Sequence, residues 1–238
     1  MLECEYSGLT RLRPPPGTLP LFPHTRGSLL ALLSAFHHNA TICTSRQELS
    51  RLLLRTKLDV CAELQQQGRS AAESQCLALK LVNASLARIE FLARRTELWA
   101  RPFGLILDPC NGCTLACPGC IHSAETRQKG LFDWPRGLLN RQRFDNYLQR
   151  FGPFATTIKF CNYGEPVLNP RTPEYIREAK RNLAQTIISS SLSVRHFDAA
   201  AYVASGLDYF LVSIDGATQT TYERFRRNGD LSLVLDNV

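Results

Sequence analysis

The sequence predicts an α/β fold in which about four parallel βα units follow an N-terminal helical region. Two observations carry this prediction. Residues 1–100 hold apolar stripes at helical spacing, whereas after Pro102 short apolar runs alternate with amphipathic segments. With 44% hydrophobic and 21% charged residues, the 238-residue chain has the composition of a globular protein of one or two domains. We therefore expect a helical region over residues 1–100 and an α/β region over residues 101–238.

The N-terminal region opens with a stretch rich in Pro and Gly, residues 1–27, which is typical of a loop or of disorder. Ser45 and Glu48 have the spacing of a capping box, and they predict a helix that ends before Gly68. A longer helix is expected over residues 71–95. The stripes of both helices are typical of core or partner-helix surfaces, and no residue here indicates chemistry.

The α/β region is predicted from a repeated order of strand, loop and helix, which favours parallel pairing. In folds of this kind the functional residues gather at the C-terminal ends of the strands. The expected strands are residues 104–108, 157–161, 185–189 and 209–214, and the expected helices are residues 139–151, 173–182, 199–205, 218–227 and 231–238.

The formal net charge of +7 is spread along the chain. Residues 1–100 carry +4 (12 Lys and Arg against 8 Asp and Glu), and residues 101–238 carry +3 (16 against 13). Specific nucleic-acid binding requires a concentrated basic patch, so we expect none. The densest basic group is predicted to be a solvated helix face and consists of Arg224, Arg226 and Arg227.

We expect no segment for membrane insertion or export in this sequence. Its longest apolar run, residues 29–36, is shorter than the roughly 18–20 residues that span a bilayer. Arginines and prolines occupy the place of a signal peptide. We therefore expect a cytoplasmic protein with reduced thiols, in which nine cysteines indicate metal or redox ligands rather than disulfides.

Four of the cysteines lie in one short segment, Cys110-Asn-Gly-Cys113-Thr-Leu-Ala-Cys117-Pro-Gly-Cys120. A zinc ribbon separates its two CxxC knuckles by about 12–20 residues, whereas three residues separate them here. A bacterial ferredoxin loop would need a cysteine at the position of Leu107. As C-x3-C-x2-C, the last three cysteines can hold three irons of a [4Fe–4S] cluster and leave the fourth iron open.

This C-x3-C-x2-C loop after the first strand resembles the hallmark of the radical S-adenosylmethionine (SAM) enzymes. The resemblance implies that Cys113, Cys117 and Cys120 ligate the cluster and that its open iron binds the amine and carboxylate of SAM. It also implies reductive cleavage of SAM to methionine and a 5′-deoxyadenosyl radical, with a flavodoxin- or ferredoxin-type reductant. Gly119 departs from the pattern, because the family usually has an aromatic residue before the last cysteine.

The second and third strands end in segments that agree with this resemblance. Gly164 and Glu165 stand where the family carries Gly-Gly-Glu or Gly-Glu-Pro, so the resemblance implies that they orient the methionine part of SAM. A turn before a helix is the structural alternative. Ser191 takes the place of an Asn after the third strand and is a candidate SAM contact through its hydroxyl.

The fourth strand ends in Ser-Ile-Asp-Gly-Ala-Thr, which resembles the fourth unit of radical SAM enzymes with a C-terminal SPASM extension. Carried over, the resemblance makes Ser213 the first candidate contact to the SAM ribose and Asp215 the second. Thr220 and Glu223 have the spacing of a capping box for the helix that follows.

The other cysteines are expected to be structural. Cys110 is interpreted as a loop residue and Cys161 as a packing residue at a strand end. We expect the cysteines of the helical region to be small buried hydrophobes: Cys4, Cys43, Cys61 and Cys76. The loop from Ile121 to Pro135 is a candidate lining of the substrate path, and no catalytic acid or base is assigned, His122 included.

The resemblance implies a partial (β/α) radical SAM barrel acting on an unknown substrate, with a slight preference for peptide or protein modification. The family usually has six βα units and this chain supplies about four, so we expect a fragment of a longer reading frame. A non-catalytic truncated paralogue is the alternative. A further alternative is a metal-binding interaction module that holds zinc through Cys110, Cys113, Cys117 and Cys120.

Overall fold

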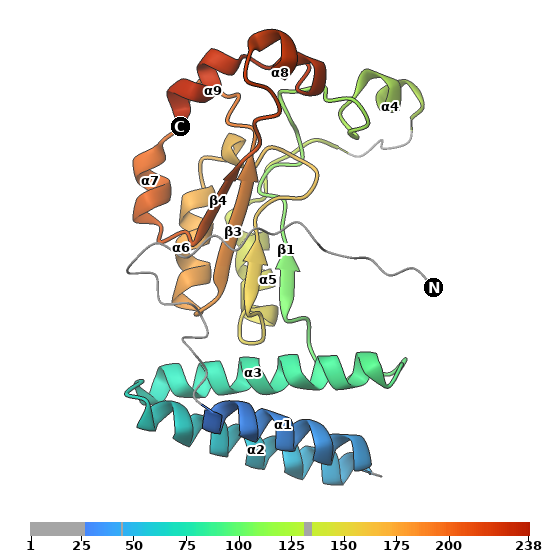
Figure 1. The fold of residues 1–238 in the computed structure, drawn as a ribbon, viewed down its shortest axis with the longest axis vertical. Helices are drawn as coiled ribbons and strands as arrows, with labels where there is room; N and C mark the ends of the chain where they lie inside the picture. The colour runs from blue at the N-terminus through green and yellow to red at the C-terminus, as the bar shows by residue number, and fades with distance from the viewer. Residues whose placement is uncertain (1–26, 44, 131–134) are drawn as a thin grey trace.

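A computed structural model describes residues 27–43, 45–130 and 135–238. Its helical bundle lies beneath an upright β-sheet, and the loops and helices at the far end of the sheet face away from the bundle (Figure 1). The predicted loop before residue 27, Cys4 and Trp134 lie outside the described residues. No helix in the described ranges combines the length and the apolar character that a membrane crossing requires.

The bundle consists of α1 (Gly27–Ile42), α2 (Arg46–Gln66) and α3 (Ala71–Leu92). The predicted capping box is confirmed, since Ser45 Oγ accepts from the Glu48 amide at 3.2 Å and Glu48 caps the Ser45 amide. Helix α1 was not predicted. In this helix Leu29 is buried, whereas the neighbouring Leu30 is 55% exposed. The apolar residues therefore do not form a single stripe at helical spacing.

The sheet has four parallel strands in the order β1 (Gly104–Ile106), β2 (Thr157–Lys159), β3 (Gln185–Ser190) and β4 (Tyr209–Val212). This confirms the predicted α/β class, although most strands are shorter than expected. The order follows the chain, so each strand pairs with the next one through a crossover. All four C-terminal strand ends therefore lie at one edge.

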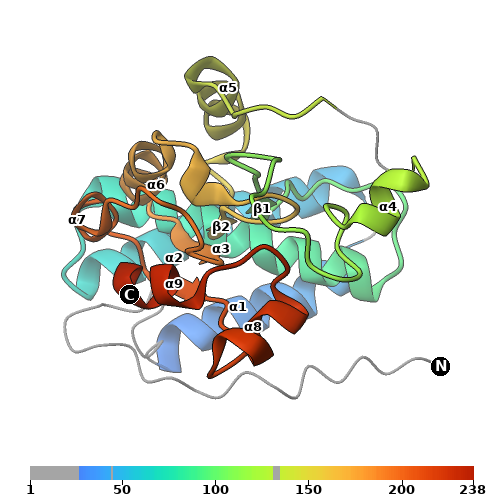
Figure 2. The ribbon, with the colours of Figure 1, turned by 90° about the horizontal axis from the view of Figure 1, so that it is seen from above.

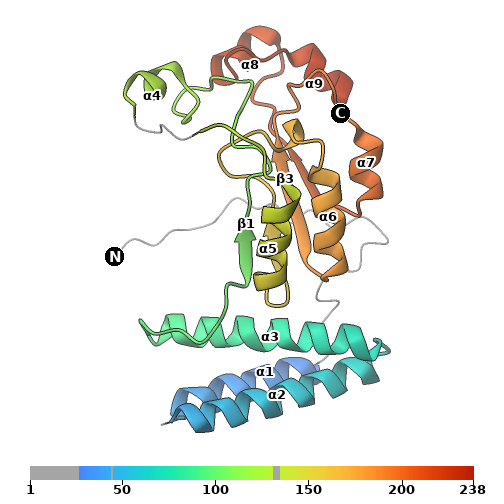
Figure 3. The same ribbon diagram turned by 180° about the vertical axis from the view of Figure 1, so that it is seen from behind.

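Helices cover one face of this sheet. Figure 3 shows α5 (Arg141–Phe151) and α6 (Thr172–Arg181) in front of the strands, with α7 (Ala199–Ala204) beside them. Phe144 and Tyr175 stack in the core between these helices and the strands, with ring centroids 4.3 Å apart. The remaining short helices lie near the C-terminal strand ends: α4 (Ala124–Gln128), the 3-10 helix η1 (Pro166–Leu168), α8 (Gln219–Phe225) and α9 (Leu231–Asn237).

The expected capping box of α8 is wrong. Thr218 is the N-cap, and its hydroxyl accepts from the Thr221 amide at 3.3 Å. Thr221 caps the Thr218 amide in return, so two threonines satisfy the reciprocal pattern that was expected of Thr220 and Glu223.

The bundle attaches to the lower end of the sheet through buried polar contacts. The fully buried Lys80 of α3 donates to the carbonyl of Gly152 at 2.6 Å and to the carbonyl of Ala155. Burial lowers the pKa of Lys80 to about 8. At pH 7 an amine with this pKa is mostly protonated and has three N–H groups, of which these two carbonyls accept two.

The three described cysteines of the bundle are half-buried rather than buried. Cys43 and Cys61 pack at the margin of the bundle core, and Cys76 lies 3.9 Å from the carbonyl of Asn182. The expectation of full burial is therefore wrong for them, because they lie at helix surfaces that neighbouring segments cover in part.

Candidate functional site

A cavity of about 310 Å³ lies at the C-terminal ends of the strands. Seen from above, the loop after β1, the segment after β2 and the chain leading into α8 lie around this end (Figure 2). The cavity lining includes seven of the eight predicted site residues: Cys113, Cys117, Cys120, Gly164, Glu165, Ser191 and Ser213. Asp215 is not part of the lining.

A turn fixes the spacing of the last two loop cysteines. The Cys120 amide donates to the Cys117 carbonyl at 3.1 Å, and Gly119 has a φ of +74°. Pro118 followed by a residue with positive φ is the pattern of a type II turn, in which glycine is favoured. Gly119, noted above as a departure from the family pattern, is therefore explained by the local backbone.

Contacts on both sides anchor the cysteine loop. The Thr114 hydroxyl donates to the Ser193 carbonyl at 3.2 Å, and the Ala116 amide donates to the Arg227 carbonyl at 3.1 Å. Leu115 between them is only 2% exposed. These bonds place the loop between the segment after β3 and the end of α8.

Two sulfurs of the loop receive donors from the chain. The Leu115 amide points to Cys113 Sγ at 3.4 Å, and Arg226 Nη1 lies 3.9 Å from Cys117 Sγ. Burial raises the pKa of Cys113 to about 11. A metal that binds Cys113 would therefore have to displace the thiol proton.

Of the other two cysteines near the loop, Cys110 lies as expected, whereas Cys161 differs from the prediction. Cys110 is buried and does not line the cavity. Its backbone forms an antiparallel β-bridge with Leu138, and its sulfur accepts the Gly112 amide at 3.3 Å. Cys161, at the end of β2, does line the cavity. The fourth thiol near the three motif cysteines is thus Cys161, which comes from another strand.

The segment after β2 is held by Asp108, which was not among the predicted site residues. Asp108 Oδ1 accepts the amides of Asn162 at 2.8 Å and Tyr163 at 3.0 Å. The neighbouring Gly164 packs directly on the cysteine loop, because an added Cβ would lie 1.8 Å from the Cys110 carbonyl oxygen. Glycine is required here for backbone-to-backbone contact within the protein.

Glu165 joins the end of β2 to the end of β3. Its carboxylate is 2% exposed and accepts the Ser190 hydroxyl at 2.5 Å, the Ser191 amide at 2.9 Å and the Ser191 hydroxyl at 2.7 Å. Leu192, next in the chain, has a φ of +51°, a left-handed conformation that is uncommon for a residue with a branched apolar side chain. The predicted site residues Glu165 and Ser191 therefore bind each other.

The segment after β4 contributes through an ion pair. Asp215 binds Arg226 Nε, and Arg226 in turn reaches the cavity and Cys117. Asp215 thus positions a cation beside the cysteine loop. The expectation that Arg226 belongs to a solvated helix face is wrong, because folding turns its side chain toward the loop. Ser213 Oγ lies 3.5 Å from Ser189 Oγ at the cavity wall.

His122 closes the loop that follows the cysteines. It is 5% exposed, and its Nε2 lies 2.9 Å from the Tyr163 carbonyl oxygen. Since Asp108 holds the Tyr163 amide, His122 and Asp108 fix the same turn from two sides. The contact gives His122 a structural role at the cavity margin.

The donor set fits an iron–sulfur cluster. Three thiols line one cavity, and an amide and a guanidinium point to two of their sulfurs, as suits an anionic sulfur-rich group. Among the residues that the structure describes, no three His, Cys, Asp or Glu side chains converge on one metal-ion position. A cluster presents separate irons, so its ligands do not need to converge in this way.

No protein-family profile matches the sequence, and no curated protein matches it significantly. Solved structures do match. BtrN in complex with AdoMet and 2-DOIA is 18% identical over 53% of this chain and 52% of that one, with a TM-score of 0.41. Methylornithine synthase (PylB) is 15% identical over 88% and 49%, with a TM-score of 0.42. Streptococcus suis SuiB bound to S-adenosylmethionine is 11% identical over 84% and 45%, with a TM-score of 0.45.

These three proteins are radical SAM enzymes, the family that the cysteine loop resembles. This chain spans about half the length of each of them.

Proposed function

We propose that this chain is part of a radical SAM enzyme, with Cys113, Cys117 and Cys120 as the ligands of a [4Fe–4S] cluster. One observation carries the proposal: the three motif thiols line a single cavity at the C-terminal ends of four parallel strands. When bound, the cluster and SAM would supply a one-electron cleavage that produces a carbon-centred radical. The protein would hold, orient and shield these groups.

The charges around the cavity support a cationic ligand beside Glu165. All hydrogen bonds of this buried carboxylate come from neutral donors, the hydroxyls of Ser190 and Ser191 and one amide. No described residue forms an ion pair with it, and the cations that line the same cavity, Lys159 and Arg226, make no direct contact with it, so a cationic ligand can pair with this carboxylate. SAM carries both an ammonium and a sulfonium group, and Glu165 would orient it mainly through this field.

The hydroxyls on the β3 and β4 side have a separate role in the proposal. Ser189 and Ser213 form a polar wall at the cavity, where they would contact the ribose of SAM. Asp215 would act through Arg226, whose guanidinium lies beside Cys117 and would face the anionic cluster that the three cysteines hold. We propose a peptide or protein as the substrate and a flavodoxin- or ferredoxin-type protein as the reductant.

Anaerobic reconstitution of the full chain with iron and sulfide tests the proposal. We expect about four irons with matching sulfide, a broad visible absorption and, with SAM and dithionite, formation of 5′-deoxyadenosine. Cys117→Ala should lose the cluster, whereas Cys110→Ala should retain it, because Cys110 lies outside the cavity lining. One zinc without sulfide would contradict the proposal and favour the zinc-binding module.

A further inference from the structure

The bundle carries a groove that the proposed chemistry does not use. It lies along the end of α3 and the segment leading to β1, with a volume of about 840 Å³. Phe91, Leu98 and Phe103 contribute apolar walls and are 80%, 62% and 46% exposed. Ala84 and Ala87 line it one turn apart on α3, so small side chains leave room for another segment.

Two buried side chains hold this groove open. Asn83 receives the Arg101 amide at 2.8 Å and donates to the Arg101 carbonyl at 2.9 Å. Glu90, which is 1% exposed, accepts the amides of Trp99 at 2.8 Å and Ala100 at 3.1 Å. These bonds hold the segment before β1 alongside α3, so both walls are in place before any partner binds.

The rim of the groove is basic. Arg88, Arg94, Arg95 and Arg101 line it, all are exposed, and none forms an ion pair with a described residue. The acid that lines it, Glu90, is already bonded to backbone amides. The apolar surface is thus surrounded by cations whose charge is not balanced within the described chain.

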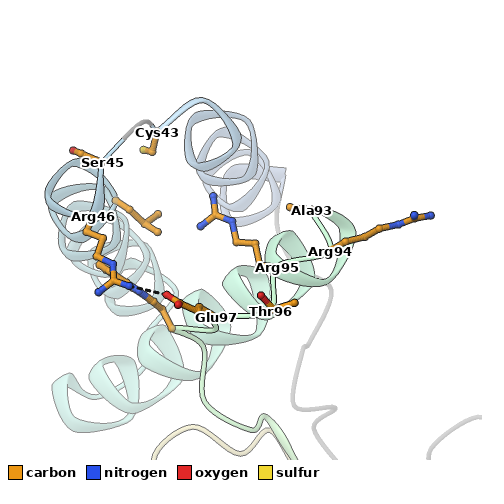
Figure 4. Close-up of a pocket in the computed structure, with 10 residues that line it drawn as sticks. Cys43, Ser45, Arg46, Ala93, Arg94, Arg95, Thr96 and Glu97 are labelled. Carbon is orange, nitrogen blue, oxygen red and sulfur yellow. Dashed lines mark hydrogen bonds and ion pairs between the residues drawn. The ribbon is translucent and has the colours of Figure 1, made fainter.

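A second hollow of about 520 Å³ adjoins the groove, and Arg94 and Arg95 line both. Figure 4 shows Arg95 directed into this hollow and Arg94 directed outward. The nearby Glu97 is bound by Arg46 at 3.0 Å, and Arg46 also lies 5.6 Å from the ring centre of Trp99. Here too the available charge is positive, because the acid is already paired.

We infer that this groove docks an acidic, amphipathic segment of a partner protein. The concave apolar surface would take the hydrophobic side chains of that segment, and the four arginines would pair with its carboxylates. A lipid bilayer is flat, and a nucleic acid has no aliphatic side chains to place against Ala84 and Ala87, so a peptide fits better. The groove lies near the start of β1, at the opposite end of the sheet from the cavity, which assigns it to partner docking rather than to the chemistry.

A synthetic peptide probe tests this inference on the full chain. The probe is a fluorescein-labelled 18-residue helix with Leu and Phe at positions i, i+3, i+4 and i+7 and Glu on its other faces. Fluorescence anisotropy should show at least tenfold tighter binding than for a scrambled peptide of the same composition, because the scrambled sequence has no apolar face. Higher salt should weaken binding, and hydrogen exchange should slow over residues 84–103.

Variants at exposed positions separate docking from folding. Arg88→Glu with Arg101→Glu, and separately Phe91→Ser with Leu98→Ser, should each weaken binding at least tenfold without changing the circular dichroism spectrum. The matched controls Arg51→Glu with Arg177→Glu, and Val203→Ser, change exposed residues elsewhere and should bind like the wild type. A triple Cys113, Cys117 and Cys120→Ala variant should also bind normally, so failure of the proposed function would not be mistaken for failure of docking.

Two results would overturn the inference. One is equal binding of the amphipathic and scrambled peptides, which would leave only a nonspecific charge effect. The other is tighter binding of phosphatidylserine vesicles or of a single-stranded RNA 12-mer than of the peptide, if the groove variants also lose that binding. That result would assign the surface to a membrane or to nucleic acid instead.

Discussion

The two ends of the sheet both hold buried or half-buried ionisable groups, but these groups find their partners differently. At the lower end, Asp208 accepts Lys180 Nζ at 2.7 Å and the Thr186 amide at 2.7 Å, while Lys80 donates to two carbonyls. At the upper end, Glu165 has neutral donors only, and the cysteine thiols face a cavity. The lower end completes its polar contacts within the chain, and the upper end leaves charge and sulfur available.

This difference indicates which polar groups are structural. A buried group whose partners are all supplied by the chain stabilises the fold, and its removal leaves those partners unsatisfied. A buried carboxylate beside thiols and hydroxyls retains capacity for a ligand. Substitutions at the two ends should therefore separate effects on stability from effects on ligand binding. The largest loss of stability is expected at the upper end, where the backbone at Gly164 packs against the backbone of the cysteine loop.

Gly164→Ala should give the largest loss of stability. The added Cβ would lie 1.8 Å from the Cys110 carbonyl oxygen, and neither backbone can move without displacing the cysteine loop. We expect a loss of about 3 kcal/mol in the free energy of unfolding, measured by urea denaturation. In the matched control Gly112→Ala, the nearest contact of the Cβ is Cys110 Sγ at 3.6 Å, and a change within about 0.5 kcal/mol is expected. Equal effects of the two substitutions would contradict the proposed packing.

Lys80→Met should lower stability by about 2 kcal/mol at pH 7, because two buried carbonyls lose their donor. Lys57→Met, on the partly exposed face of α2, serves as the control and should have little effect.

The contribution of Lys80 should also depend on pH. Its folded pKa of about 8 lies below its ordinary value of 10.5, so between these values the unfolded state binds more protons. Stability therefore rises with pH in this window, and the difference between wild type and Lys80→Met should grow by up to about 3 kcal/mol from pH 8 to 10.5. Denaturation of both proteins across this range checks the sign. A constant difference would mean that Lys80 titrates normally.

The sequence was sufficient for the elements whose signal is local. Periodicity predicted the four strands and helices α2 and α3, and the spacing of Cys113, Cys117 and Cys120 placed them in one loop. The residues that were missed act through contacts made only on folding. Asp108 reaches amides more than fifty positions away in the chain, and Arg226 lies 109 positions from Cys117. No short-range pattern could show either contact.

Glu165→Gln should change ligand binding more than stability. Gln keeps one carbonyl acceptor for the serines but loses the negative charge, so we expect a cost of about 1 kcal/mol in unfolding free energy. On the proposed function, the reconstituted variant should retain its cluster and bind SAM at least tenfold more weakly, measured by equilibrium dialysis. Ser213→Ala is the comparison at the end of β4 in the same cavity and should weaken SAM binding by a smaller factor. Unchanged SAM binding in Glu165→Gln would show that the carboxylate only joins β2 to β3.

Gly119→Ala tests the smallest effect, on the geometry of the cysteine loop. Space is not limiting, because no atom lies within 4 Å of the added Cβ, but the φ of +74° is unfavourable for alanine by about 1 kcal/mol. Gly137→Ala is the matched control, since its Cβ is equally free and its φ is not positive. We expect Gly119→Ala to reconstitute with less iron per chain and to lose its visible absorption faster in air, while Gly137→Ala behaves like the wild type. If both retain the same iron content and the same decay rate, the turn does not set the spacing of Cys117 and Cys120, and the strain is relieved elsewhere in the loop.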